Sequence, residues 1–196
     1  VLPPGIERER LQGTTSVQQQ NEQSVLVKVT DLEPGDTRAI FKNTTFDLRM
    51  YKRLKMFIHA EAIVGNVQVN DDELLGIIRL GSDTDDNYYQ IEIPLKITNF
   101  NAVTAEEIWP EENNINAGIE EFGNLKLERQ EVGAPATDLY PQPQPGEAPE
   151  YRIRVKGNPN LANIRTIMLG VKNVSFMTKS MELWFNELRV SDFDNA

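Results

Sequence analysis

The side chains best suited to catalysis are scarce in this sequence. His59 is the only histidine and cysteine is absent, so a His–His metal pair and thiolate chemistry have no candidates. Glutamate pairs occur at 106–107, 111–112 and 120–121, but adjacent residues on a helix do not face one cleft, as a glycosidase requires. No phosphate-binding glycine loop or nucleophile elbow is found. We therefore expect no enzymatic activity and no bound cofactor, with His59 in a structural role.

Three aspartates make up the segment whose chemistry best suits a metal ion. Asp83, Asp85 and Asp86 lie in a short polar stretch, and Ca²⁺ prefers carboxylate and carbonyl oxygens. The EF-hand spacing is absent, however, because the loop lacks both the glycine at its sixth position and the glutamate at its twelfth. The sequence thus leaves two readings, a calcium site at these residues or a solvated acidic turn, and we favour the turn.

Aromatic side chains offer a second kind of binding chemistry. Tyr88, Trp109, Tyr140 and Trp184 could form a stacking platform for a surface glycan, as in lectin-like sandwiches. Such residues serve equally well as anchors of a hydrophobic core. A carbohydrate-binding module is therefore the alternative function, and the core reading is preferred.

The overall charge excludes several classes of partner. Thirty acidic against 20 basic residues give a net charge of −10, which disfavours nucleic acid and anionic lipid, since both attract Lys and Arg. No apolar run reaches the roughly 18 to 20 residues of a membrane-spanning helix. No targeting signal is visible at Val1, so we expect either a removed signal or an internal fragment.

Period-two alternation predicts strands through most of the chain. Residues 1–23 are polar and are expected to form an extended leader, whereas Val25, Val27 and Val29 alternate with other residues as in a half-buried strand. The clearest hairpin joins 74–80 to 88–95 through the turn-rich residues 81–87. Residues 42–53 are interpreted as a polar connection in which 51–53 resemble a turn. Strands are predicted at 24–30, 37–41, 54–60, 74–80, 88–95, 151–156, 167–174 and 181–190.

An insertion at 98–149 interrupts this pattern. Thr104 and Glu107 form a capping box for a short helix, and Ile115, Ile119 and Phe122 recur at helical spacing. Residues 131–149 are rich in proline, which predicts an extended, exposed loop. The sequence therefore predicts one mainly β domain over 24–196, an antiparallel two-sheet β-sandwich of jelly-roll, concanavalin- or lectin-like type, with a helical and Pro-rich insertion at 98–149. The strand order is left open.

Several short motifs, in order along nearly the whole chain, resemble the SprA/Sov family of the Bacteroidetes, whose members serve gliding motility and type IX secretion. They are PGIER at 4–8, NEQS at 21–24, GDTRA at 35–39, DLRMYKRLKMFIHAE at 47–61, IWPEEN at 108–113 and LWFNELRV at 183–190.

The resemblance implies a setting for the domain. Proteins of that family form a very large outer-membrane β-barrel that conducts folded cargo and is engaged by partner proteins. The chain would then be a soluble, non-catalytic structural or interaction domain of this translocon in the cell envelope, on the periplasmic or the extracellular face. Its expected partners are the remainder of the parent barrel protein, type IX secretion proteins and cargo. The family supplies no catalytic motif.

Overall fold

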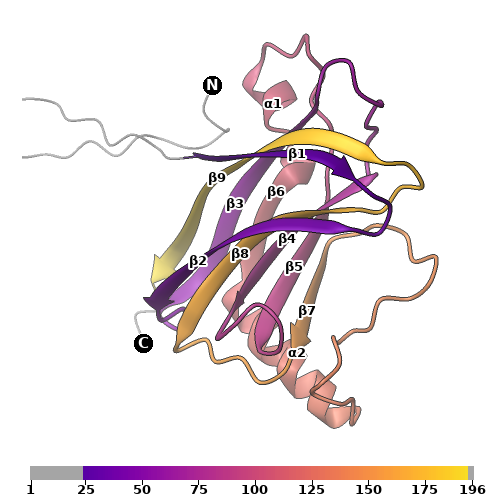
Figure 1. The fold of residues 1–196 in the computed structure, drawn as a ribbon. Coiled ribbons are helices and arrows are strands. Elements are labelled where there is room, and N and C mark those ends of the chain that lie inside the picture. Colours follow the sequence, from indigo (N-terminus) through magenta and orange to yellow (C-terminus); the bar gives the residue numbers. More distant parts are fainter. Residues whose placement is uncertain (1–23, 194–196) are drawn as a thin grey trace, which may run out of the picture.

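The computed structural model describes residues 24–193, which form two antiparallel β-sheets packed face to face (Figure 1). The strands are β1 (Ser24–Leu32), β2 (Thr37–Phe46), β3 (Tyr51–Ala62), β4 (Leu74–Gly81), β5 (Tyr88–Pro94), β6 (Asn114–Gly118), β7 (Arg152–Lys156), β8 (Ile164–Asn173) and β9 (Lys179–Phe193). The four-stranded sheet has the order β1-β9-β3-β6, and the five-stranded sheet has the order β2-β8-β4-β5-β7. The mainly β, two-sheet sandwich predicted from the sequence is confirmed.

Nested pairing defines the topology of the sandwich. β4 pairs with β5, β3 with β6, β2 with β8 and β1 with β9, all antiparallel, so each pair encloses the previous one along the chain. Successive pairs alternate between the two sheets. This is the arrangement of a jelly roll, and β7 is an added strand at the edge beside β5. The topology agrees with the jelly-roll prediction.

Alternation along the strands builds the core between the sheets. On β3, Leu54, Met56 and Ile58 are at most 2% exposed, and they face buried residues of the other sheet such as Ile78 and Ile91. Period-two spacing places these side chains on one face. Their removal from water supplies the main stabilisation of the sandwich.

The insertion contains one strand, β6, that was not predicted from the sequence pattern. Residues Ala105–Ile108 form helix α1, Glu111–Asn113 form the 3₁₀ helix η1, and helix α2 spans Ile119–Glu131. The capping box of Thr104 and Glu107 is confirmed at α1. Ile115, however, belongs to strand β6, where it pairs with Met56 of β3. The helical interpretation was wrong there because Ile115 and Ala117 alternate into the core, while the apolar spacing from Ile119 onward is that of α2.

Two further expectations concern the ends of elements. Residues Tyr51, Lys52 and Arg53 were expected to form a turn, but they belong to β3, because Tyr51 and Arg53 pair with the end of β9. β2 likewise extends to Phe46. Distant pairing thus overrides the local polar composition.

The leader predicted at 1–23 lies outside the described residues. Within residues 24–193, no helix combines the length and apolar character needed to cross a bilayer.

Candidate interaction surface

Four connections meet at one end of the sandwich. They are residues 33–36, 63–73, 95–104 and 174–178, which join β1 to β2, β3 to β4, β5 to α1 and β8 to β9. The register explains the gathering, because Leu32 pairs with Lys179, Ala62 with Met181 and Leu74 with Asn173. Figure 1 shows these connections toward the top and right of the molecule. We call this end the loop end.

The loop end carries large apolar side chains that face solvent. Phe176 is 99% exposed, Val103 79% and Val64 78%. Phe100, Met177 and Val67 are also exposed. These six residues come from three of the four connections. Single exposed apolar residues are ordinary, whereas a contiguous apolar patch marks an interaction site. Because these six stand on neighbouring connections, the loop end is a candidate for such a site.

A buried lysine holds one of these loops at its base. Lys179 is 2% exposed, and its Nζ lies 2.6 Å from Glu73 Oε2 and 2.7 Å from the carbonyl oxygen of Gln68. Burial alone would raise the pKa of the Glu73 carboxyl, but hydrogen bonds from Lys179 and Asn70 lower it. The carboxylate therefore stays ionised and paired at neutral pH. Loop 63–73 is fixed against the start of β9, while Val64 and Val67 remain outside.

The second loop is tied to the first. Lys96 Nζ lies 2.9 Å from Asp72 Oδ2 and 3.8 Å from Asp71 Oδ2, and the hydrogen bond that Lys96 donates to Asp72 is the main cause of a raised Lys96 pKa. Asn113, which is fully buried, accepts a hydrogen bond from the Lys96 N–H and donates one to the Lys96 carbonyl. Loop 95–104 is thereby held on both sides, with Phe100 and Val103 outside.

The β8–β9 turn is organised by a third buried polar side chain. Asn173, also fully buried, donates from Nδ2 to the carbonyl oxygens of Leu32 and Met177, and its Oδ1 accepts from the Ser175 hydroxyl. The turn is thus closed below Phe176 and Met177. Because the bases of these loops are already fixed, less conformational entropy is lost when a partner orders the exposed apolar side chains. The arrangement suits binding to an apolar protein surface.

His59 lies beneath loop 95–104, inside an aromatic cluster on the four-stranded sheet, and its Nδ1 is 3.2 Å from the Thr98 hydroxyl. It is 7% exposed, its Nδ1 lies 2.7 Å from the carbonyl oxygen of Ile108, and its ring lies 4.8 Å from Trp184 and 5.6 Å from Trp109. These contacts attach the segment around η1 to β3. The geometry gives His59 a packing role.

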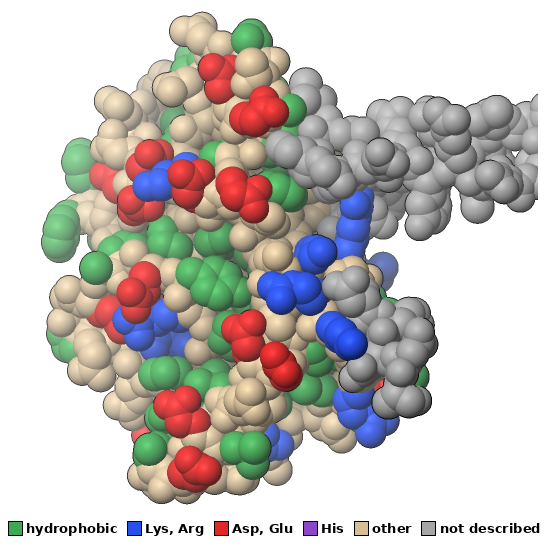
Figure 2. Space-filling view, turned by 180° about the vertical axis from the view of Figure 1, so that it is seen from behind, with side chains coloured by type: hydrophobic (Ala, Val, Ile, Leu, Met, Phe, Trp, Pro, Cys, Tyr) green, Lys and Arg blue, Asp and Glu red, His purple; other side chains and the backbone are tan. Residues whose placement is uncertain are grey.

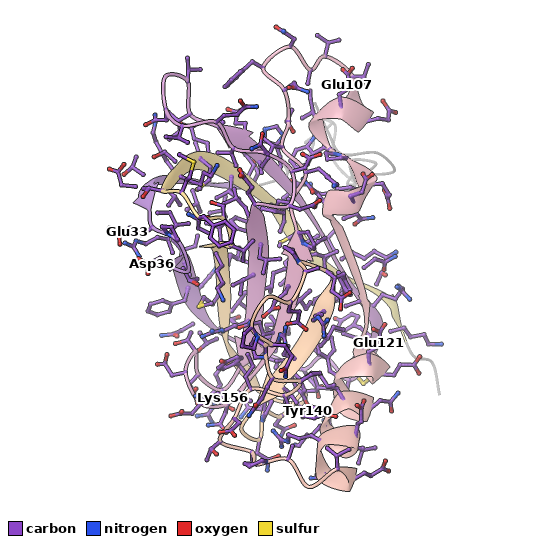
Figure 3. All side chains as sticks on the ribbon, turned by 90° about the vertical axis from the view of Figure 1, so that its right-hand side faces the viewer. Glu33, Asp36, Glu107, Glu121, Tyr140 and Lys156 are labelled. Carbon is purple, nitrogen blue, oxygen red and sulfur yellow. The ribbon has the colours of Figure 1, made fainter. Side chains whose placement is uncertain are left out.

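The aspartates of the calcium hypothesis lie at the opposite end, in the β4–β5 turn. Asp83 Oδ1 accepts hydrogen bonds from the backbone of residues 85–87, whereas the carbonyl of Asp85 and the carboxylate of Asp86 contact Lys156 Nζ. Figure 3 shows Lys156 far from Glu107 of α1 at the loop end. Among the described residues, no group of three or more His, Asp or Glu side chains is placed to hold a metal ion. Calcium remains a hypothesis without geometric support.

The aromatic residues considered for glycan stacking are not assembled into one platform. Tyr88 is 4% exposed beneath the guanidinium of Arg79 on the five-stranded sheet. Trp109 is 7% exposed and packs, with Trp184, around His59 on the other sheet. Tyr140 lies in the Pro-rich segment and donates to Glu128. The structure thus separates these rings between the two sheets.

A groove of about 720 Å³ lies where β3 meets α2 and includes several cations. Arg49 is paired with Asp47 at 2.8 Å, and Arg53 donates to the Asn116 carbonyl at 2.7 Å. Glu120 and Glu121 line the same groove. Figure 2 shows Lys and Arg side chains gathered on one side of the molecule seen from behind. The paired arginines and neighbouring glutamates make this a mixed-charge surface rather than an anion site.

The comparison with protein-family models identifies the chain. Residues 1–196 match the family SprA_N, described as motility related/secretion protein. The chain belongs to the SprA_N family. Membership confirms the resemblance drawn from the ordered motifs and gives this SprA_N domain a motility- or secretion-related function. A comparison with curated protein sequences found no match.

Sequence reasoning missed the apolar loop tips of this SprA_N domain. A visible signal existed, since Phe100 and Val103 stand among Asn and Thr residues, and Phe176 and Met177 follow Val174-Ser175. Large apolar side chains within turn-rich segments are candidates for binding. Their common location required the strand register, which the sequence did not provide.

Proposed function

We propose that this SprA_N domain is a non-catalytic interaction domain of the outer-membrane type IX translocon, which supports transport of folded cargo. The observation that carries the proposal is the match to a motility and secretion family along residues 1–196. The loop end supports it, because six exposed apolar side chains stand on loops with buried, polar bases. The domain works in the cell envelope by surface complementarity, with the larger secretion protein or one of its partners covering the loop end.

The decisive experiment removes the apolar tips without disturbing their bases. In the full-length secretion protein, Phe100→Ser, Val103→Ser, Phe176→Ser and Met177→Ser are combined, and secreted cargo is quantified in the culture medium. We expect secretion to fall by about tenfold or more, since a few buried anchors dominate most interfaces. Circular dichroism of the isolated chain should stay unchanged, because all four side chains are exposed.

A matched control uses exposed apolar residues at the other end. Leu127 and Val132, 58% and 62% exposed, lie at α2 and just after it. Leu127→Ser combined with Val132→Ser should leave secretion unchanged. Normal secretion in the loop-end variant would refute the docking role, and an equal loss in both variants would show that the effect is not specific to the loop end.

A further inference from the structure

The interior of the sandwich is incompletely covered along the side formed by β1 and β2. Val25 faces inward, since its partner Phe185 is 2% exposed, yet Val25 itself is 42% exposed. On the other sheet, Ile40 of β2 and Ile78 of β4 both pair with Leu169 of β8, so their side chains lie on the same, inward face. Ile78 is fully buried, whereas Ile40 is 40% exposed. Figure 1 shows β1 and β2 diverging from the turn that joins them. Apolar side chains on this side therefore remain open to solvent.

Among the four edge strands within residues 24–193, β2 has the longest run of uninterrupted pairing. A backbone bridge from Tyr140 covers β7, and β6 has only five residues. A register shift between Val29 and Leu32, with Asp31 at φ 51°, interrupts β1. β2 has a register shift of its own between Asn43 and Phe46, but residues 37–43 before it pair without interruption with β8, are exposed on both faces, and have no strand on the other side within residues 24–193. Bulges, short length and coverage protect an edge from strand addition.

The side chains of β2 indicate which kind of strand could pair with its free edge. Arg38, Ile40 and Lys42 share the inward face, and Ala39 and Phe41 share the outer face, where Phe41 is 69% exposed. Opposite charges at directly facing positions stabilise a strand pair, and like charges destabilise it. A second copy of β2 paired antiparallel would place Arg38 against Lys42. Arg38 also lies 3.5 Å from Asp36, but both side chains are about half exposed, and such a pair is weak. The edge thus disfavours its own copy and favours a strand with acidic residues at both positions.

We propose that β2 is an acceptor edge for an added β-strand with the pattern acidic, three apolar residues, acidic. The acidic residues face Arg38 and Lys42, and the apolar residues lie beside 39–41. Backbone hydrogen bonds to the free edge hold the strand, and its apolar side chains cover Ile40 and Phe41. This goes beyond the docking role of the loop end, because it concerns another surface and holds whether or not that role does.

The test uses synthetic peptides as long as β2, with the sequence Glu-Val-Val-Phe-Glu at the centre and threonines outside. Calorimetry should show binding to the chain, and hydrogen exchange should slow at the β2 amides that do not bond to β8. The same peptide with proline at the central valine should not bind, because proline removes a backbone donor.

A charge swap makes the inference specific. Arg38→Glu combined with Lys42→Glu should weaken binding of the acidic peptide at least about tenfold, and a peptide with lysine in place of both glutamates should bind this variant. Lys55→Glu, a lysine change on the other sheet, should leave affinity within about twofold. Absence of binding, protection outside β2, or failure of the lysine peptide to bind the swapped variant would overturn the proposal. None of these results bears on secretion through the loop end.

Discussion

The Asp83 carboxylate organises the β4–β5 turn. Its oxygens accept hydrogen bonds from the backbone N–H groups of Asp85, Asp86 and Asn87, and from the Asn87 side chain at 3.0 Å. Burial by itself would raise the pKa of this carboxyl, but these hydrogen bonds outweigh burial and lower the pKa to about 2. The ionised carboxylate is therefore part of the folded turn.

Replacing Asp83→Ala should lower the free energy of unfolding at pH 7 by about 1 to 2 kcal/mol, after allowance for partial solvent screening. The carboxyl has a lower pKa folded than unfolded, so its contribution is fully present above about pH 4 and is lost as pH falls toward about 2. Urea denaturation of both proteins across this range should show the difference shrinking as pH falls. A constant difference would contradict the ionised role.

Calcium should leave the thermal stability of the chain unchanged, because Lys156 Nζ occupies the contacts to Asp85 and Asp86. A ligand that binds only the folded state raises its apparent stability. Thermal denaturation with EDTA and then with excess Ca²⁺ provides the measurement. A rise in melting temperature that disappears in Asp85→Ala would restore the calcium hypothesis.

Sequence predicted residue roles where the partners are close along the chain. The capping box joins Thr104 to Glu107, three residues apart, and was recognised directly. Lys179 and Glu73 are 106 residues apart, and no local pattern indicates that they meet. Lys179 resembles any polar residue at a strand start until the register of β9 is known.

At the scale of elements, the Pro-rich segment is held on the sheet by a buried arginine. Arg154 of β7 is 2% exposed, and its Nη2 lies 3.0 Å from Glu147 Oε2. Its Nε lies 3.0 Å from Glu92 Oε2 of β5, close enough for an ion pair but without hydrogen-bond alignment. The arginine therefore joins a strand, its neighbour and the loop that covers them.

Arg154→Leu should destabilise the domain by about 3 to 5 kcal/mol, because it leaves the buried Glu92 without its counter-charge. The double variant with Glu92→Leu should recover part of this loss. Arg152→Leu, at a 28% exposed side chain, should cost no more than about 1 kcal/mol. Chemical denaturation measures all three, and a double variant less stable than Arg154→Leu would contradict the assignment.

Local sequence patterns predicted most of the strands but missed β6. Strand alternation and turn residues identified most strands, as well as the β4–β5 hairpin, because the information lies within each strand. β6 escaped recognition, since five residues with two inward side chains match a helical or a strand period equally well. Its pairing with β3 decides the outcome.

For the whole molecule, strand separation along the chain should order the folding steps. β4 and β5 pair across a short turn, whereas β1 pairs with β9 by joining Ser24 to Asn186. Long-range pairing costs loop entropy before it gives contacts, so it forms late. The nested order of a jelly roll cannot be read from local alternation for the same reason, since any strand with one apolar face could fill several places in the two sheets.

Two substitutions test this order of events. Ile91→Val, in the buried part of β5, should slow refolding, with a loss of about 1 kcal/mol. Val29→Ala, in β1, should instead act mainly by speeding unfolding. Stopped-flow fluorescence of the two tryptophans, Trp109 and Trp184, follows both reactions. If Val29→Ala instead slowed refolding and Ile91→Val mainly sped unfolding, β1 and β9 would pair early.

The antiparallel β1–β9 pair also sets how the domain responds to tension. Ser24 at the start of β1 pairs with Asn186 of β9, and β9 continues beyond this ladder to Phe193, paired with β3. A force applied at Ser24 and Asn186 opens the hydrogen bonds in succession, as a zipper opens, rather than shearing them together. We expect an optical-trap experiment with handles at both points to show β1 peeling away at low force. In a motility or secretion apparatus, such a domain would extend at low force and refold when the force is released.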